Sequence, residues 1–271
     1  MFEARGGILR LVTADRIAAV EAFQRQYRIV RERDGYRTGT PAYYRMLPVV
    51  PRSDPRADEW RVRRESCAHL QQHVLPGVWQ GPIRILDLGA GNGWLSHRLA
   101  AFGHQVVAVD LLDDDLDGLG VCRHYPVTLI LVQADFDALP FAPSQFEVVV
   151  LNGALHYAPD PEATLRAAIR TMTGNGTLVV MDSPMFRREK DGQAMVERQL
   201  RALAARHNLP EVLRPGLGFL TYDRLNRVAR EKGLTSTFIP SSGSFEWRWR
   251  RRASWLRLGR APASFGVWMA Q

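Results

Sequence analysis

Three glycines that follow a short apolar run are the residues of this sequence best suited to hold a ligand. Gly89, Gly91 and Gly93 follow the run at residues 83–88 and precede a helix-forming segment. Because glycine has no Cβ, its backbone can approach a ligand closely, and the next helix points free N–H groups at that ligand. Trp94 stands where the G-x-G-x-x-G dinucleotide pattern needs its third glycine. The turn is predicted to bind a ligand, and an ordinary tight turn of another doubly wound fold stays open as the alternative.

An acidic residue ends the next apolar segment, at a place that suits a ribose. The strand predicted at residues 105–109 ends in Asp110, whose carboxylate could accept hydrogen bonds from both ribose hydroxyls. The aspartates at 113, 114, 115 and 117 are expected to form the solvated start of a helix. The pattern therefore singles out Asp110 as the second candidate binding residue.

Four motifs, each at the carboxyl end of a predicted strand, resemble those of the class I S-adenosylmethionine (SAM) dependent methyltransferases. They are Asp87-Leu-Gly-Ala-Gly-Asn-Gly, Asp110, Asp135-Phe136 after a strand at 127–133, and Asn152-Gly-Ala-Leu-His-Tyr-Ala-Pro-Asp after a strand at 146–151. The last motif is similar to that of small-molecule methyltransferases of the ubiquinone and menaquinone biosynthesis type. The resemblance spans about residues 60–183, and residues 184–271 only by strand order. It implies SAM as the cofactor and methyl transfer to an oxygen, nitrogen or carbon atom of a small-molecule acceptor.

The resemblance also implies which residues would contact SAM. They are Asp87, Gly89, Ala90, Gly91, Asn92, Gly93, Asp110, Leu111, Asp135, Phe136 and Asn152. The glycine loop would receive the amino-acid end of SAM, whose amino group Asp87 would orient. Asp110 would hold the ribose, Asp135 and Phe136 the adenine, and Asn152 would close the pocket near the methionine moiety.

Few side chains need to take part in the chemistry, because SAM carries an activated methyl group and correct positioning alone accelerates such a transfer greatly. His156 is the candidate general base, since a neutral imidazole with a pKa near 6.5 can take a proton from an oxygen or nitrogen nucleophile. The alternative is that His156 caps a helix or packs in the pocket wall. Tyr43, Tyr44 and Tyr157 are the candidates for contact with the acceptor.

The elements that must position these residues predict an α/β fold, a doubly wound, seven-stranded Rossmann-like sheet of order 3-2-1-4-5-7-6. Residues 1–80 are expected to form a helical N-terminal extension that acts as a lid, with a helix capped by Thr13, a loop at 34–51 and a helix capped by Asp54. Residues 81–271 form the expected methyltransferase domain. An insertion rich in arginine and tryptophan lies at about 241–264.

Composition indicates a globular chain of 271 residues without an apolar run that could span a membrane. The sequence starts without a signal pattern and has only two cysteines, which favours the cytoplasm. Neither cysteine has partners at metal-ligand spacing, so no metal site is expected. The formal charge of +8 comes almost entirely from arginine. Because arginine and tryptophan in the insertion suit RNA, an RNA methyltransferase remains an alternative, as does a non-catalytic SAM-binding regulator.

Overall fold

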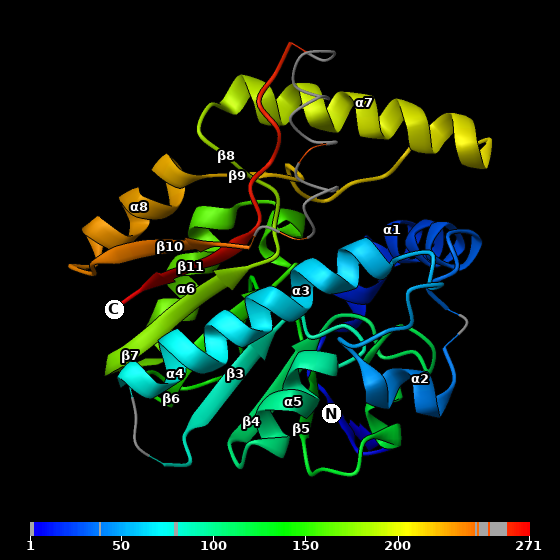
Figure 1. The fold of residues 1–271 in the computed structure, drawn as a ribbon. Helices are drawn as coiled ribbons and strands as arrows, with labels where there is room; N and C mark the ends of the chain where they lie inside the picture. The colour runs from blue at the N-terminus through cyan, green and yellow to red at the C-terminus, as the bar shows by residue number, and fades with distance from the viewer. Residues whose placement is uncertain (1–2, 38, 79–80, 242, 244–248, 250–258) are drawn as a thin grey trace.

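A nine-stranded sheet lies at the centre of the described chain, with helices on both of its faces (Figure 1). The computed structural model describes residues 3–37, 39–78, 81–241, 243, 249 and 259–271. The order of the strands across the sheet is β1-β2-β5-β4-β3-β6-β7-β11-β10. These strands are β1 (Glu3–Arg5), β2 (Ile8–Arg10), β3 (Arg84–Leu88), β4 (Gln105–Asp110), β5 (Ile130–Gln133), β6 (Phe146–Asn152), β7 (Met172–Met181), β10 (Ser236–Pro240) and β11 (Gly266–Ala270). The five strands from β5 to β7 are parallel, so their carboxyl ends share one edge of the sheet.

Alternation of buried side chains along the strands explains why both faces are covered. Val149 and Leu151 of β6 belong to one hydrophobic cluster, and Val148 and Val150 belong to the other. The first cluster includes buried residues of α6 (Pro161–Thr171) and α8 (Tyr222–Glu231), and the second includes those of α3 (Ala57–His69) and α5 (Trp94–Ala101). Strands buried on both faces are typical of parallel sheets, and their burial supplies most of the stabilisation.

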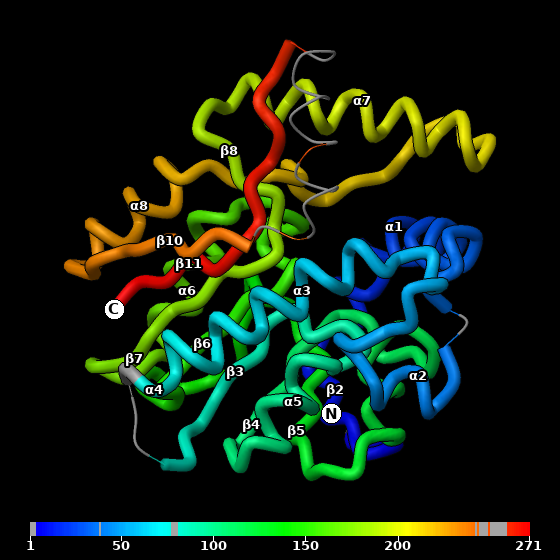
Figure 2. Tube along the Cα trace, in the orientation of Figure 1, coloured from blue at the N-terminus to red at the C-terminus, as the bar shows by residue number. Residues whose placement is uncertain are grey.

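Further helices lie outside these layers or extend them. They are α1 (Ala14–Arg33), α2 (Pro41–Met46), the π-turn η1 (Leu70–Val74), α4 (Leu75–Val78), the 3₁₀ turns η2 (Leu119–His124) and η3 (Leu155–Tyr157), and α7 (Glu189–His207). A short parallel pair, β8 (Met185–Phe186) and β9 (Leu220–Thr221), joins the chain on either side of α7. Figure 2 shows the segment after α7 running back between α7 and α1.

The N-terminal extension adds two strands to the sheet, which corrects both the expected seven strands and the expected all-helical extension. β1 and β2 form a hairpin in which Arg5 pairs with Ile8 across Gly6 and Gly7, and β2 pairs with β5 in parallel. Both glycines have positive φ, 61° and 77°, as a two-residue hairpin turn of this type requires. The Gly-Gly pair was the signal for this turn, and the strands beside it have only three residues each. Seven strands of the sheet, β5-β4-β3-β6-β7-β11-β10, follow the expected arrangement.

Two further expectations about the extension differ from the structure. The segment expected to be a loop at 34–51 contains α2, capped by Thr40, whose side chain accepts a hydrogen bond from the backbone N–H of Tyr43. The following helix, α3, begins at Ala57, and Asp54 instead accepts a hydrogen bond from the N–H of Arg56 before the helix starts. Thr13 caps α1 as expected.

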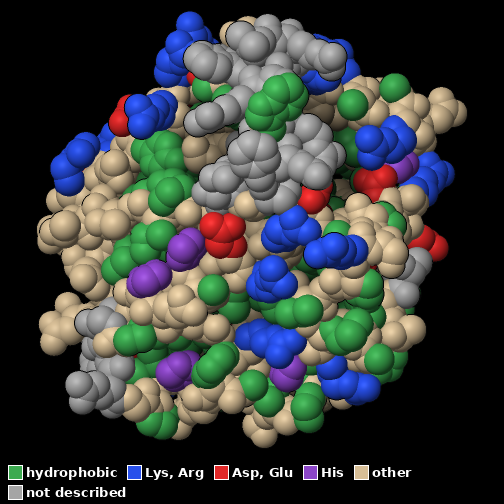
Figure 3. All heavy atoms as spheres, in the orientation of Figure 1, with side chains coloured by type: hydrophobic (Ala, Val, Ile, Leu, Met, Phe, Trp, Pro, Cys, Tyr) green, Lys and Arg blue, Asp and Glu red, His purple; other side chains and the backbone are tan. Residues whose placement is uncertain are grey.

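The arginine- and tryptophan-rich insertion expected at about 241–264 lies largely outside the described residues. Figure 3 shows arginine and lysine side chains mixed with hydrophobic and histidine side chains on the face that carries α3 and α5. Among the described residues, none of the helices combines the length and the apolar character needed to cross a membrane.

Candidate functional site

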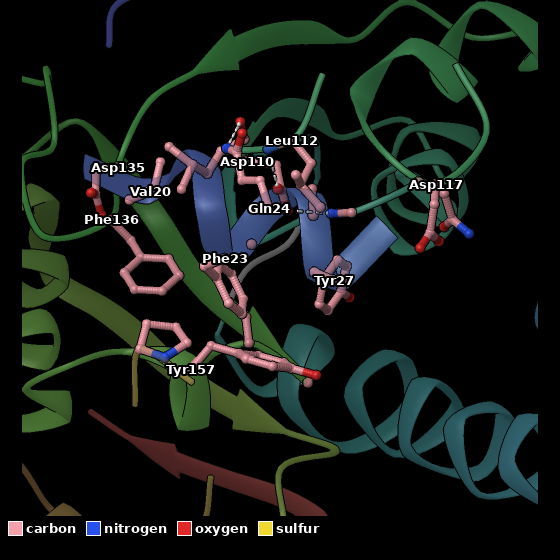
Figure 4. A pocket seen from close by; sticks show the side chains of 18 of the residues that line it. Val20, Phe23, Gln24, Tyr27, Asp110, Leu112, Asp117, Asp135, Phe136 and Tyr157 are labelled. Atoms are coloured by element: carbon pink, nitrogen blue, oxygen red, sulfur yellow. Dashed lines mark hydrogen bonds between the residues drawn. The ribbon is translucent and has the colours of Figure 1, made fainter. Parts of the chain in front are cut away.

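The carboxyl ends of β3, β4, β5 and β6 open into one cavity, and α1 lies across it (Figure 4). Most of the residues that line it come from the loops after these strands and from α1, and Arg63, Trp94 and Pro215 line it from other parts of the chain. After the strands they are Gly89, Ala90, Gly91, Asn92, Asp110, Leu111, Leu112, Asp135, Phe136, Asn152, Gly153 and Ala154. Those from α1 are Arg16, Val20, Phe23, Gln24, Tyr27 and Arg31. Nine of the eleven residues that the resemblance assigns to SAM are in the first set, and Asp87 and Gly93 are not.

The glycine loop after β3 is held tightly against its neighbours. The N–H groups of Gly89 and Ala90 both donate to the carbonyl oxygen of Val109, at 2.8 and 2.9 Å. Gly89 has φ +76°, and a Cβ built on it would lie 2.3 Å from the Cβ of Ala154. Residue 89 therefore has to be glycine both for its backbone conformation and for the close approach of the loop after β6.

Asp110 joins the glycine loop to the end of β4. One carboxylate oxygen accepts from the N–H of Gly91 at 2.7 Å, and the other accepts from the N–H of Leu112 at 2.8 Å. The carboxylate is thus fixed at the cavity wall, and each oxygen keeps a further lone pair for a ligand. Burial raises the pKa of Asp110 to about 6.

Asp87 and Gly93 lie behind the cavity, which corrects the expectation that they contact a ligand directly. Asp87 is 1% exposed. One of its oxygens accepts from the hydroxyl of Ser96 at 2.6 Å, and its other oxygen has no partner among the described residues. Burial raises the pKa of this carboxyl to about 7. Gly93 caps α5 and faces Cys122. Both residues hold the loop and α5 in place.

The raised pKa of Asp87 predicts a pH-dependent difference in stability between wild type and the Asp87→Asn variant. In the unfolded chain this carboxyl loses its proton near pH 4, whereas in the folded chain it keeps the proton until about pH 7. Folding takes up a proton between these values, so wild type loses stability as the pH rises through this window. The asparagine variant cannot titrate. Its free energy of unfolding should therefore rise relative to that of wild type by up to about 1.4 kcal/mol per pH unit within this window.

Urea denaturation at pH 5, 6, 7 and 8 measures this difference. It should grow from pH 5 to 7 and stay level above. Asp115→Asn is the matched control, since the side chain of Asp115 is 63% exposed. Parallel stability curves for wild type and Asp87→Asn would show that the carboxyl titrates normally in the folded chain.

The carboxylate expected to hold the adenine amine is already engaged by α1. Asp135 pairs with Arg16, and its other oxygen accepts from the N–H of Asp137 at 3.1 Å. Phe136 lies beside it in the cavity wall (Figure 4). A ligand in this part of the cavity would therefore contact Asp135, Phe136 and the first turns of α1.

A set of arginine–carboxylate pairs holds the N-terminal segment over the cavity, and we name it the arginine strap. Its pairs are Arg10–Asp113, Arg16–Asp135, Arg31–Asp117 and Arg37–Asp114. Three of these aspartates belong to the group expected to be a solvated helix start, and that expectation was wrong for them. The sequence carried a signal for the strap. Arginines are spaced along residues 10–37, and a run of aspartates, which carry the opposite charge, lies at residues 113–117.

The pair between Arg31 and Asp117 is the most buried of the strap. The guanidinium donates two hydrogen bonds to the carboxylate, at 2.6 and 2.7 Å, and the Asp117 side chain is only 4% exposed. Removing Arg31 leaves a buried charge without its partner. We expect Arg31→Met to lower the free energy of unfolding by about 3–5 kcal/mol.

The control for this prediction is Arg25→Met on the same helix, because Arg25 is 71% exposed and pairs with the exposed Glu21. The control should cost less than about 1 kcal/mol. Urea denaturation at pH 7 measures the free energy of unfolding of both variants. Equal losses of this free energy would mean that the buried Arg31–Asp117 pair stabilises the fold no more than an exposed pair does.

The three tyrosines expected to contact an acceptor lie in two different places. Tyr43 and Tyr44 are on α2, away from the cavity, which corrects that expectation for both. The hydroxyl of Tyr43 accepts from Arg56 and from the indole N–H of Trp60, and that of Tyr44 donates to the carbonyl oxygen of Leu116. Tyr157 does line the cavity.

His156 lies beside the cavity but is not among the residues that line it. Its Nδ1 is 3.1 Å from the hydroxyl oxygen of Ser183. Burial, together with the charges of Arg214 and Arg63, lowers the pKa of His156 to about 3. An imidazole with so low a pKa is a weak proton acceptor. The structure therefore favours the packing alternative over the predicted general base.

Comparison with known proteins finds a protein family whose model matches part of this chain. The family model described as "Methyltransferase domain" matches residues 86–180. The chain is 30% identical over 118 residues to a malonyl-[acyl-carrier protein] O-methyltransferase of Erwinia pyrifoliae, covering 44% of this chain and 43% of the relative. It is 34% identical over 111 residues to a ubiquinone biosynthesis O-methyltransferase of Xanthomonas campestris pv. campestris, covering 39% and 43%. The matches thus span less than half the length of these relatives.

One solved structure resembles nearly the whole chain. It is the 1,6-didemethyltoxoflavin-N1-methyltransferase of Burkholderia thailandensis, whose structure contains 1,6-didemethyltoxoflavin and S-adenosylhomocysteine. The two chains are 18% identical with a TM-score of 0.52, over 96% of this chain and 90% of the other. At this identity the likeness shows a common fold.

Proposed function

We propose, on the premise that residues 86–180 form a methyltransferase domain of the class I SAM-dependent group, that this chain binds SAM in the cavity and methylates a small molecule. The domain match confirms the resemblance predicted from the four motifs. One observation carries the proposal. The fixed carboxylate of Asp110 and the glycine loop lie in the wall of the same cavity, at the carboxyl ends of parallel strands.

The residues present fit the parts of SAM. A Cβ built on Gly91 would meet no atom closer than 4.0 Å, so the loop leaves open space where a ligand backbone or ribose could lie. Asp110 offers both carboxylate oxygens to the ribose hydroxyls. Asp135 and Phe136 would contact the adenine, and Asn152 would lie near the methionine moiety. The roles of these residues are part of the proposal.

The chain's own contribution to the reaction is positioning. When bound, SAM supplies a methyl group on a sulfonium, and the acceptor takes it while the C–S electron pair stays on sulfur and any acceptor proton passes to solvent. The cavity walls would hold the acceptor in line with the methyl group, and α1 would limit the access of water. His156 is not needed for this function, since neither its place nor its low pKa suits a base.

Two alternatives predict different results. An RNA methyltransferase would use the insertion at 241–264, which lies largely outside the described residues and so gives this alternative no structural support. A SAM-binding regulator would bind SAM without consuming it.

The test combines calorimetry with a transfer assay. Binding of SAM and S-adenosylhomocysteine is measured first, and the protein is then incubated with methyl-labelled SAM and either a low-molecular-weight metabolite extract or total RNA. We expect binding of both compounds and label in the small molecules. Absence of binding would overturn the proposal. Label only in RNA would favour the RNA methyltransferase, and binding without any transfer would favour the regulator.

A further inference from the structure

Three aromatic side chains leave part of their ring surface open to the cavity. Phe23 and Tyr27 come from α1, and Tyr157 comes from the loop after β6 (Figure 4). All three line the cavity, and each is only half-buried. The ring centroids of Phe23 and Tyr27 are 5.6 Å apart, and Tyr27 meets Tyr157 edge-to-face at 6.1 Å. A planar ring system can cover such surfaces together, so this aromatic wall suits an aromatic ligand.

The segment at 211–218 fixes the two parts of the aromatic wall relative to each other. The side chain of Gln26 on α1 donates to the carbonyl oxygen of Glu211 at 2.8 Å and accepts from the N–H of Leu213 at 2.6 Å. The N–H of Gly218 donates to the carbonyl oxygen of His156 at 2.9 Å. The segment thus joins α1 to the loop after β6, one residue from each tyrosine of the wall.

The two tyrosines also bring polar groups to the aromatic wall. Neither hydroxyl has a hydrogen-bond partner among the residues that the structure describes. Burial raises the pKa of Tyr27 well above its usual range, so its hydroxyl stays neutral and can donate. A ligand with an uncharged polar group on its ring can therefore be oriented here.

Every arginine that lines the cavity in the described part of the chain is already paired with a carboxylate. The pairs are Arg16–Asp135, Arg31–Asp117 and Arg63–Glu59. The described lining residues include no lysine or histidine. Asp110 also lines the cavity, and its carboxylate accepts from backbone N–H groups. An anionic ligand would lose its water here without gaining a cation, so the lining favours an uncharged one.

We propose that the methyl acceptor is an uncharged planar aromatic compound, which packs against Phe23, Tyr27 and Tyr157. This inference rests on the proposed function, because it takes the cavity wall at Asp110 and the glycine loop as the SAM site. SAM itself needs no spare cation, since its methionine end carries an ammonium beside the carboxylate. A nucleophilic atom of the acceptor would take the methyl group, the C–S electron pair would stay on sulfur, and any proton on that atom would pass to solvent.

The experiment measures the fluorescence of 2-naphthamide as it binds at pH 7 to protein saturated with S-adenosylhomocysteine. Two matched compounds compete with it. Decahydro-2-naphthamide has the same carbon skeleton without a planar aromatic ring, and 2-naphthoate has the same ring with a negative charge. Wild type should bind 2-naphthamide about tenfold more tightly than either compound, because the first loses the ring contacts and the second is desolvated without a cation.

Variants of the aromatic wall test the ring contacts. Tyr27→Leu should weaken the binding of 2-naphthamide by about two- to tenfold and leave that of decahydro-2-naphthamide nearly unchanged. Tyr27→Phe keeps the ring and should keep the preference for the aromatic compound. Phe102→Leu is the control, since Phe102 is 63% exposed at the end of α5, and it should have no effect.

A further variant tests the charge. Glu59→Gln leaves Arg63 without its carboxylate but can still accept from the hydroxyl of Tyr36. It should tighten the binding of 2-naphthoate about threefold or more, as a charge-assisted hydrogen bond would, and leave that of 2-naphthamide unchanged. Glu197→Gln makes the same change of net charge at a side chain that is 66% exposed on α7, and it should leave both affinities as in wild type.

Each contrary outcome has a distinct meaning. Equal binding of 2-naphthamide and decahydro-2-naphthamide by wild type would overturn the aromatic part of the proposal, and this comparison needs no variant that has to fold. Equal binding of 2-naphthamide and 2-naphthoate by wild type would overturn the uncharged part, as would an unchanged preference in Glu59→Gln. Absence of binding of all three compounds by protein that binds S-adenosylhomocysteine would overturn the acceptor site as a whole. Failure to bind S-adenosylhomocysteine would instead overturn the proposed function.

Discussion

Replacing Asp110 with asparagine should weaken binding of both SAM and S-adenosylhomocysteine by about 100-fold or more. The carboxylate would hold two ribose hydroxyls, and each hydrogen bond to a charged group contributes about 1.5–3 kcal/mol. Asparagine has a single acceptor oxygen, so it also cannot accept from both Gly91 and Leu112 as the carboxylate does. The loss should appear by isothermal titration calorimetry at pH 8, where wild-type Asp110, with its pKa of about 6, is ionised.

The matched control is Asp115→Asn, which removes a carboxylate from the same loop at an exposed position. It should bind both compounds as wild type does. Circular dichroism and thermal unfolding show whether the Asp110 variant remains folded. A folded Asp110→Asn protein with unchanged affinity would mean that the ribose is held elsewhere.

Gly89→Ala should lower the free energy of unfolding by about 2–5 kcal/mol. A residue with a Cβ costs about 1–2 kcal/mol at this positive φ, and overpacking costs about 1–3 kcal/mol more, because the new methyl would lie 2.3 Å from the Cβ of Ala154. The loop would have to move away from its hydrogen bonds to Val109, so SAM binding should fall with stability. Urea denaturation and calorimetry measure the two effects.

Two controls separate backbone strain from the clash. Gly233→Ala places alanine at φ +71°, with no atom within 4 Å of the new Cβ, and should show only the cost of the backbone conformation. Adding Ala154→Gly to Gly89→Ala removes the methyl that is hit and should recover the overpacking part. If the double variant is no more stable than Gly89→Ala, the contact with Ala154 is not the cause.

The core of the fold could be predicted because its apolar runs and the residues that end them are both visible in the sequence. The apolar runs at β3, β4 and β6 end at glycine, aspartate or asparagine, and each of these ends lies at the cavity. Thr13 caps α1 as its position indicates. These signals are local, so they need no knowledge of the rest of the chain.

What could not be predicted depends on contacts between distant segments. The strands of the N-terminal hairpin have three residues each, too few to show a period, and β2 is stabilised by pairing with β5. The arginine strap joins residues that are 77 to 119 positions apart in the sequence. Tyr27 and Pro215 likewise reach the cavity only through the packing of α1 and the segment after α7. Helical spacing alone could not show which face of α1 would meet the cavity.

The arginine strap also bears on what the smallest working unit of this protein is. The matched methyltransferase domain, residues 86–180, contains every aspartate of the strap, while every arginine of the strap lies before residue 38. A chain trimmed to begin at residue 81 would keep the glycine loop and Asp110, but each of the four aspartates of the strap would lose the arginine that pairs with it. The loss of these ion pairs would loosen the loops after β4 and β5 that carry the aspartates. The first 37 residues are therefore a structural half of the ligand site rather than an appendage to it.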